Sequence, residues 1–295
     1  MGGDDTPTRE KEFGGLDPAP ATCSKHDENT RRPDVAGGDG RVGPASMSVR
    51  VLAQGLSDVG LVRKRNEDAF HVDGAAGLGV VADGMGGAPA GELASSLAIE
   101  TVLKVLTADA GVLNGDLAGS VRQAVEAADQ AVRDEGESNP LNRGLGCTLT
   151  VLRIDREKAT FAVAHVGDSR AYRFRSGVLE QLTQDHTLAQ ESVDQGRLPP
   201  DAVRHHPFGH ILTRVIGMSE GAEPQILTGD LRAGDLFFLC TDGVIRVLED
   251  DELERVLARG LPLSEVASLV IQEANERGGP DNSTVVLVQV SAEGG

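Results

Sequence analysis

The chain has 295 residues, of which 39% are hydrophobic and 25% are charged, and its formal net charge is −18 at pH 7. This length and apolar content suffice for one large folded domain with a full core. The acidic balance argues against general nucleic-acid binding and against contact with an anionic membrane, since both require a basic surface. With no apolar stretch long enough to span a bilayer and no charged-then-apolar leader, we expect a cytoplasmic protein.

The first 46 residues mix Gly, Pro, Asp, Glu and Arg with almost no apolar periodicity, so we expect a disordered tail over 1–46. Met47 stands just before the first expected strand, and two explanations stay open: extra sequence from the gene start, or a regulatory tail. Of the three cysteines, Cys147 and Cys240 lie in apolar runs and Cys23 lies in the tail. Their spacing matches no zinc site, so we expect reduced, structural thiols.

Apolar periodicity predicts most of the elements in chain order. Alternating or continuous apolar runs predict strands over 48–57, 69–72 and 78–83. Helical spacing then predicts an antiparallel pair of helices over 91–106 and 115–133 on one sheet face. A meander of four strands is expected to follow over 147–154, 159–166, 170–174 and 178–182.

The second half begins with a short predicted helix over 185–195. The loop over 196–221 is polar, contains His205, His206 and His210, and is long enough to suggest a functional or mobile segment. Further elements are predicted as strands over 222–228 and 236–240, helices over 250–259 and 263–277, and a last strand over 283–290. The order predicts an α+β fold of two mainly antiparallel sheets with a helix pair on each outer face.

One pattern recurs along the chain: an apolar strand delivers an aspartate into a turn. It occurs at Asp83, Asp168 and Asp242, and Asp281 lies in a similar turn ahead of a strand. A single Asp-Gly pair is most often a plain turn. Several such acids at neighbouring strand ends would repel one another unless a cation lay between them, and the absence of zinc spacing favours Mg²⁺ or Mn²⁺ with oxygen ligands.

A charged turn over 57–68 adds Glu67 and Asp68 to these acids and places Arg63 five residues before Asp68. Such a turn is usually a solvated surface. A guanidinium group, however, matches the oxygens of a phosphate in a bidentate manner, and two ions sharing an aspartate would activate a bridging water as a nucleophile. Together these residues point to hydrolysis of a phosphomonoester.

Seven segments of the chain, in order, resemble the bacterial branch of the metal-dependent protein phosphatase (PPM) family, the type 2C serine/threonine phosphatases. They are residues 57–68, 82–87, 144–149, 166–170, 212–217, 240–243 and 279–284, and the resemblance covers essentially 48–290. It implies a four-layer α-β-β-α sandwich with metals in a cleft between the sheet edges. It also implies a catalytic domain over 47–291, a flap over about 196–221, and a short tail over 292–295.

The resemblance also implies roles for single residues. Asp83 would bridge two core Mn²⁺ or Mg²⁺ ions, Asp242 and Asp281 would bind one of them, and the Gly84 carbonyl would bind the other. Glu67 and Asp68 would hold metal-bound waters, and Arg63 would bind the substrate phosphate. Asp168 together with Asp242 would match a third, weaker metal. The implied catalytic residues are Arg63, Asp83, Asp242 and Asp281.

The implied reaction is removal of phosphate from phosphoserine and phosphothreonine on proteins, by direct attack of a metal-bridging hydroxide. The expected partners are phosphorylated proteins and a cognate serine/threonine kinase, with no nucleic acid and no membrane, and we expect a monomer. Two alternatives are a phosphatase of anti-sigma-factor antagonists and a pseudophosphatase that binds phosphoproteins without catalysis. The first usually lacks the Arg63 segment and the flap, and the second loses metal-binding acids, whereas this chain has all of these features.

The general acid stays open in the sequence. Eukaryotic members of the family have a histidine where Met85 stands, and a thioether cannot donate a proton. A metal-bound water is the first hypothesis, and His186 is the second.

Overall fold

The fold is described from a computed structural model of the chain. The described residues are 49–87, 90–108, 116–203, 206–218 and 221–292. The expected tail over 1–46, Cys23 and His205 lie outside these ranges.

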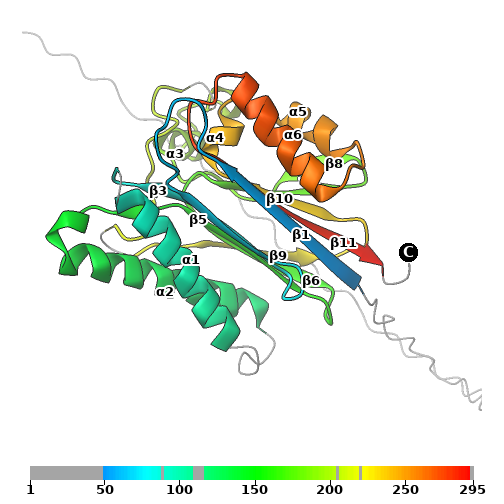
Figure 1. Cartoon of the computed structure of the whole chain (residues 1–295), viewed down its shortest axis with the longest axis horizontal. Coiled ribbons are helices and arrows are strands. Elements are labelled where there is room, and N and C mark those ends of the chain that lie inside the picture. The colour runs from blue at the N-terminus through cyan, green and yellow to red at the C-terminus, as the bar shows by residue number, and fades with distance from the viewer. Residues whose placement is uncertain (1–48, 88–89, 109–115, 204–205, 219–220, 293–295) are drawn as a thin grey trace, which may run out of the picture. The chain divides into compact units, whose positions relative to one another are not determined.

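Two antiparallel sheets form the centre of the fold (Figure 1). The first sheet has the strand order β1, β11, β10, β7, β8, with bounds Val49–Asp58, Ser283–Ala292, Leu236–Cys240, Arg170–Arg175 and Val178–Gln181. The second has the order β2, β3, β5, β6, β9, with bounds Asp68–Asp73, Leu78–Met85, Leu149–Asp155, Thr160–Val166 and Gln225–Asp230. A two-residue strand, β4 (Gly146–Cys147), pairs with the end of β3.

Helices cover the outer face of each sheet. The pair α1 (Ala90–Ala108) and α2 (Leu117–Ser138) packs on the second sheet, and the pair α5 (Asp250–Leu257) and α6 (Leu263–Glu276) packs on the first. Two short helices, α3 (Leu188–Asp194) and α4 (Asp242–Ile245), and two 3₁₀ turns at 140–142 and 200–202 lie in the connections. In the described residues, no helix combines the length and the apolar character that crossing a membrane requires.

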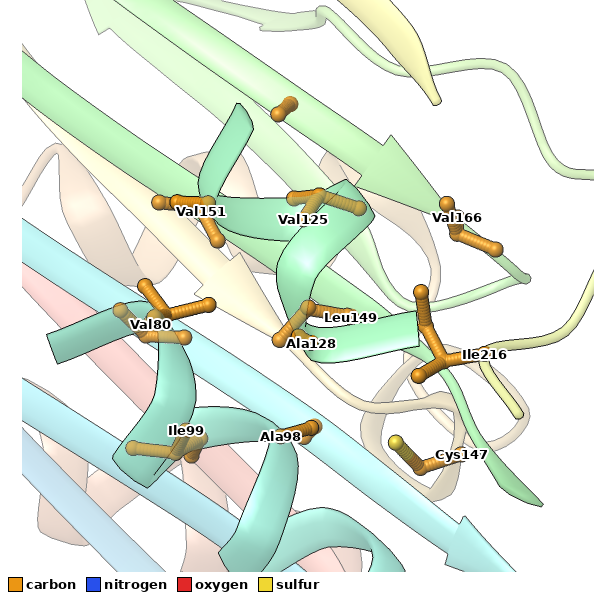
Figure 2. Close-up of a cluster of buried hydrophobic side chains, with 14 of the residues drawn as sticks. Val80, Ala98, Ile99, Val125, Ala128, Cys147, Leu149, Val151, Val166 and Ile216 are labelled. Carbon is orange, nitrogen blue, oxygen red and sulfur yellow. The ribbon is translucent and has the colours of Figure 1, made fainter. Parts of the chain in front are cut away.

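Three buried clusters fill the spaces between the four layers. Figure 2 shows the outer cluster of the second sheet, where Val80 and Val151 lie with Ile99 and Val125 of the helices. Val81, the next residue along β3, belongs instead to the cluster between the two sheets. Because successive side chains of a strand point to opposite faces, both faces of β3 must be apolar in a sandwich covered by helices. The α-β-β-α sandwich is confirmed.

The predicted four-strand meander is wrong. Strand β6 pairs with β5 and β9 in the second sheet, whereas β7 pairs with β10 and β8 in the first. The chain therefore changes sheet between Val166 and Arg170, at Gly167, whose φ is +109°. Apolar runs predicted the individual strands, but the sheet to which a strand belongs depends on packing partners that are far away in sequence.

Two element boundaries near the acids also differ from the prediction. Strand β3 continues through Asp83 to Met85, because the end of the strand finds a partner in β4. Asp242 does not lie in a turn but is the first residue of α4, which Thr241 separates from the end of β10. Both acids are therefore fixed by regular backbone rather than by loops.

Candidate metal centre

The predicted acids gather at one pocket of about 250 Å³. Its walls include the end of β3, the connection after β6, the start of α4 and the turn before β11, so both sheets contribute. Seven of the eight predicted site residues line it: Arg63, Glu67, Asp83, Gly84, Asp168, Asp242 and Asp281. The eighth, Asp68, does not line the pocket but is directly opposite Asp83 in the β2–β3 register.

Thr148 holds the backbone of Asp83 through both its N–H and its carbonyl group. The Asp83 N–H donates to Thr148 Oγ1 over 2.9 Å, and the Asp83 carbonyl accepts from the Thr148 N–H over 2.8 Å. Gly84 follows, and a Cβ there would collide with the carbonyl oxygens of Gly91 and Glu67. A glycine is therefore required for the strand end to lie so close to the neighbouring backbone.

Asp68 lies behind the pocket in a network of hydroxyl groups. Its Oδ2 accepts from Thr241 Oγ1 over 2.8 Å and from Thr284 Oγ1 over 2.7 Å. Its Oδ1 is buried and has no hydrogen-bond partner among the described residues. One oxygen of this carboxylate is thus fixed by the first sheet, and the other is left for a ligand.

Asn282 fixes the charged turn over 57–68 onto the turn before β11. Its side-chain oxygen accepts from the Glu67 N–H, and its amide donates to the carbonyls of Val59 and Arg65, each over 2.9 Å. All of its side-chain contacts are therefore with backbone. Asn282 is therefore a structural residue that joins the two turns.

Burial and mutual repulsion disfavour the charged forms of these acids. Burial raises the pKa of Asp68 to about 7, and burial followed by repulsion from Asp242 raises the pKa values of Asp83 and Asp168 well above the usual range. Burial also raises the pKa of Asp242, whose Oδ1 is buried without a hydrogen-bond partner among the described residues. Buried carboxylates with free oxygens fit oxygen-coordinated divalent cations, whose charge would offset the repulsion.

Two arginines contact the acids in the present arrangement. Arg63 Nη2 donates to Asp281 Oδ2 over 2.8 Å, and its side chain is 54% exposed at the rim. Arg246 donates to Asp242 and lies 3.5 Å from Asp281 Oδ2. In the described ranges, no three acidic, histidine or cysteine side chains are grouped closely enough to hold one ion.

His186 does not share the pocket of the acids. It lines a separate pocket with Asp185 and Arg214, and its Nδ1 accepts from the Gly167 N–H over 3.1 Å. Burial, followed by the neighbouring His165, lowers the pKa of His186 to about 3. Its placement favours a structural role at the sheet change rather than contact with a substrate.

The predicted flap reaches the acids through His210 and Leu212, which both line the pocket. Leu212 forms a β-bridge with Thr187, and Ile216 forms one with Cys147, so its C-terminal half is fixed to the domain.

Sequence reasoning missed the position of His210 and the presence of Arg246 in the pocket. Arg246 lies four positions after Asp242, a spacing that places two residues on one helix face, but the sequence did not predict the short helix that makes this spacing relevant.

Comparison with known proteins places the chain among characterised phosphatases. Residues 62–274 match the family model described as protein phosphatase 2C. The serine/threonine protein phosphatase PstP of Mycobacterium tuberculosis is 37% identical over 235 residues, which are 79% of this chain and 44% of PstP. The protein phosphatase PhpP of Streptococcus pneumoniae is 35% identical over 245 residues, 81% of this chain and 97% of PhpP.

A solved structure of the PstP catalytic domain in complex with two manganese ions is also similar. It superimposes with a TM-score of 0.73 at 35% identity, covering 82% of this chain and 99% of that one. The chain thus spans less than half the length of PstP as a whole but almost the entire crystallised catalytic domain.

Proposed function

Since the chain belongs to the protein phosphatase 2C family, we propose that it hydrolyses phosphoserine and phosphothreonine on proteins with Mn²⁺ or Mg²⁺ as cofactor. One observation carries the proposal: buried aspartates from both sheets surround a pocket that has an exposed arginine, Arg63, at its rim. A site of this kind holds a cluster of hard cations beside a group that can bind a phosphate.

The acids divide into ligands and supporting groups. Asp83 would be shared by two ions, Asp242 and Asp281 would bind one of them, and the Gly84 carbonyl would bind the other. Glu67 and Asp68 would orient water beside the ions, and the hydroxyls of Thr241 and Thr284 hold Asp68 in place for this. When bound, the ions supply an activated water and positive charge toward the phosphoryl oxygens.

Arg63 would exchange partners when substrate enters. Its guanidinium group now donates to Asp281, which raises the pKa of Arg63 and keeps it fully charged. If Asp281 bound an ion, its carboxylate would no longer accept from Arg63, and the Arg63 guanidinium group could donate to two phosphate oxygens instead. Because Arg63 lies at the rim of the pocket, a phosphate bound to it would be held next to the acids.

The chain's expected partners are phosphorylated proteins, with a serine/threonine kinase that phosphorylates the same targets. The relatives PstP and PhpP bear the names of protein phosphatases, which favours this substrate class over the two alternatives. The presence of every predicted acid in one pocket or directly behind it also disfavours a pseudophosphatase.

The test is release of phosphate from a phosphothreonine peptide by the purified chain, with Mn²⁺ and with EDTA. Turnover is expected only with Mn²⁺, and Asp242→Asn should reduce it by at least about 100-fold because a ligand is lost. Asp251→Asn is a matched control on exposed α5, where Asp251 pairs with Arg255, and it should leave the rate unchanged. Absence of turnover from a folded protein that binds Mn²⁺ would overturn the proposal.

A further inference from the structure

Arg246 brings a fixed positive charge into the pocket of acids. It caps the C-terminal end of α4, one helical turn after Asp242, and it donates to the Asp242 carboxylate. Its other terminal nitrogen, Nη1, lies 3.5 Å from Asp281 Oδ2. The group therefore bridges two predicted metal ligands from within the chain.

Four aspartates act electrostatically on Arg246. Burial alone would lower its pKa, but Asp242, Asp168, Asp281 and Asp83, in decreasing order, raise it. In return, Arg246 lowers the pKa of Asp168 against the larger effects of burial and of Asp242. The guanidinium thus offsets part of the charge at Asp168 and Asp242.

Arg246 lies beside the two residues that the family resemblance assigns to a third ion. Asp168, Asp242 and Arg246 line the main pocket, and the same three residues line an adjoining pocket of about 340 Å³. An ion held by Asp168 and Asp242 would have to share the Asp242 carboxylate with a guanidinium that cannot lose its proton. The guanidinium group and a divalent cation at the same carboxylate would repel each other, so the residues present do not fit a third divalent cation.

We propose that Arg246 supplies the positive charge at the Asp168–Asp242 end of the pocket, so that the protein holds two ions and no third. This rests on the two-ion site of the proposed function. It means that Asp168 is a partner of the Arg246 charge rather than a metal ligand, which revises the role that the family resemblance implies for it. A tethered cation is present at any metal concentration, so metal binding should end at two ions.

The test counts Mn²⁺ bound at saturation by equilibrium dialysis and by isothermal titration calorimetry, without substrate. The wild-type chain and Arg246→Lys, which keeps the positive charge, should bind two ions. Arg246→Ala should bind the same two and a third, weaker one. Adding Asp168→Asn to Arg246→Ala should abolish the third binding step.

Arg255→Ala is the matched control, because it removes one arginine from an exposed pair on α5 and leaves the pocket intact. It should bind two ions. If Arg246→Ala does not fold, Arg246→Gln keeps most of the side-chain length without the charge and carries the same expectation of three. Three ions in the wild type, or two in a folded Arg246→Ala or Arg246→Gln, would overturn the inference. Two ions without phosphate release would overturn only the proposed function.

Discussion

A chain of hydrogen bonds leads to Asp68, and the single proton of each hydroxyl group decides which group donates in each bond. Asn66 Nδ2 donates to Ser57 Oγ over 2.7 Å, and Ser57 Oγ lies 2.6 Å from Thr284 Oγ1. Because the single proton of Thr284 goes to Asp68, Ser57 must donate to Thr284. The network explains why polar residues from segments that are far apart in sequence recur around one carboxylate.

Removing one donor from this network should weaken metal binding without touching a ligand. Thr284→Val keeps the shape of the side chain but leaves Asp68 Oδ2 with Thr241 as its one remaining donor, so the carboxylate is less well oriented. We expect the dissociation constant for Mn²⁺ to rise by about tenfold, the lower end of the effect of supporting residues. Calorimetric titration measures it, with Thr228→Val on the exposed face of β9 as the control. Equal affinities in wild type and Thr284→Val would show that the network is only structural.

The histidines of the site differ in the pH dependence that they can confer. His186 has a pKa lowered to about 3, so it stays neutral throughout the range in which activity would be measured. His210 lines the pocket of acids itself, on the exposed side of the flap. We therefore expect His186→Gln to leave the alkaline limb of the pH–rate profile unchanged, and His210→Gln to alter it if a histidine protonates the leaving oxygen.

The profile is measured as kcat against pH from 6 to 10 with a phosphothreonine peptide. An altered alkaline limb in His186→Gln would indicate that His186 donates a proton in the reaction. Unchanged limbs in both variants would favour water beside the ions as the proton donor.

At the scale of elements, apolar periodicity predicted nearly every helix and strand, because each lies against a buried cluster on at least one face. Strand β10, with five fully buried residues, was predicted with its observed bounds. The connection between β6 and β7 could not be predicted in the same way. Strands β6 and β7 were each predicted correctly, but the sheet to which each belongs depends on pairing with β9 and β10, which come more than 50 residues later.

The site shows the same division. The acids stood out because they follow apolar strands, and the family resemblance brought them together before any geometry was known. Arg246 carries no such signal, since an arginine after a short helical segment is usually a surface residue. Its importance depends on α4 beginning at Asp242, a boundary that periodicity over four residues cannot predict.

The sheet change itself offers a prediction. Gly167 has a φ of +109°, and a Cβ there would come within 2.5 Å of Thr148 Cγ2. Gly177, in the exposed turn between β7 and β8, has a φ of +86° and open space around it. Gly177→Ala should therefore cost roughly 1–2 kcal/mol from backbone strain alone, and Gly167→Ala should cost roughly 1–3 kcal/mol more because a packed side chain must move.

Urea unfolding monitored by circular dichroism gives both values. The Gly167 N–H donates to His186 Nδ1 and the Gly167 carbonyl accepts from the His186 N–H, so part of the cost of Gly167→Ala should come from weakening these two hydrogen bonds. Equal costs for the two variants would mean that the connection can shift away from Thr148 freely.

At the scale of the whole molecule, repulsion among the buried carboxylates lowers the free energy of unfolding until cations bind between them. Asp242 follows β10 and Asp281 precedes β11, both strands of the first sheet, whereas Asp68 and Asp83 lie in the second sheet. Ions shared among them would therefore link the two halves of the sandwich. Ligands that bind only the folded form stabilise it by about 2.7 kcal/mol at 100 times the dissociation constant. For a domain of this size that corresponds to a rise in melting temperature of roughly 5–10 °C.

The pH dependence of this stability should reverse with metal. In EDTA, the pKa of Asp68 is about 7, above that of an unfolded aspartate, so the folded form binds more protons than the unfolded form and loses stability as the pH rises toward and through 7. With saturating Mn²⁺ the acids are ionised in both measurements, and the loss should disappear. Calorimetry at pH 7 and pH 8.5 separates the two cases, because below pH 7 the buried neutral His165 and His186 would add stability as the pH rises. Asp83→Asn should lose the Mn²⁺ shift. If the melting temperature in EDTA does not fall between these pH values, the repulsion of the acids is already relieved within the protein, and Arg63 and Arg246 are the cations placed to relieve it.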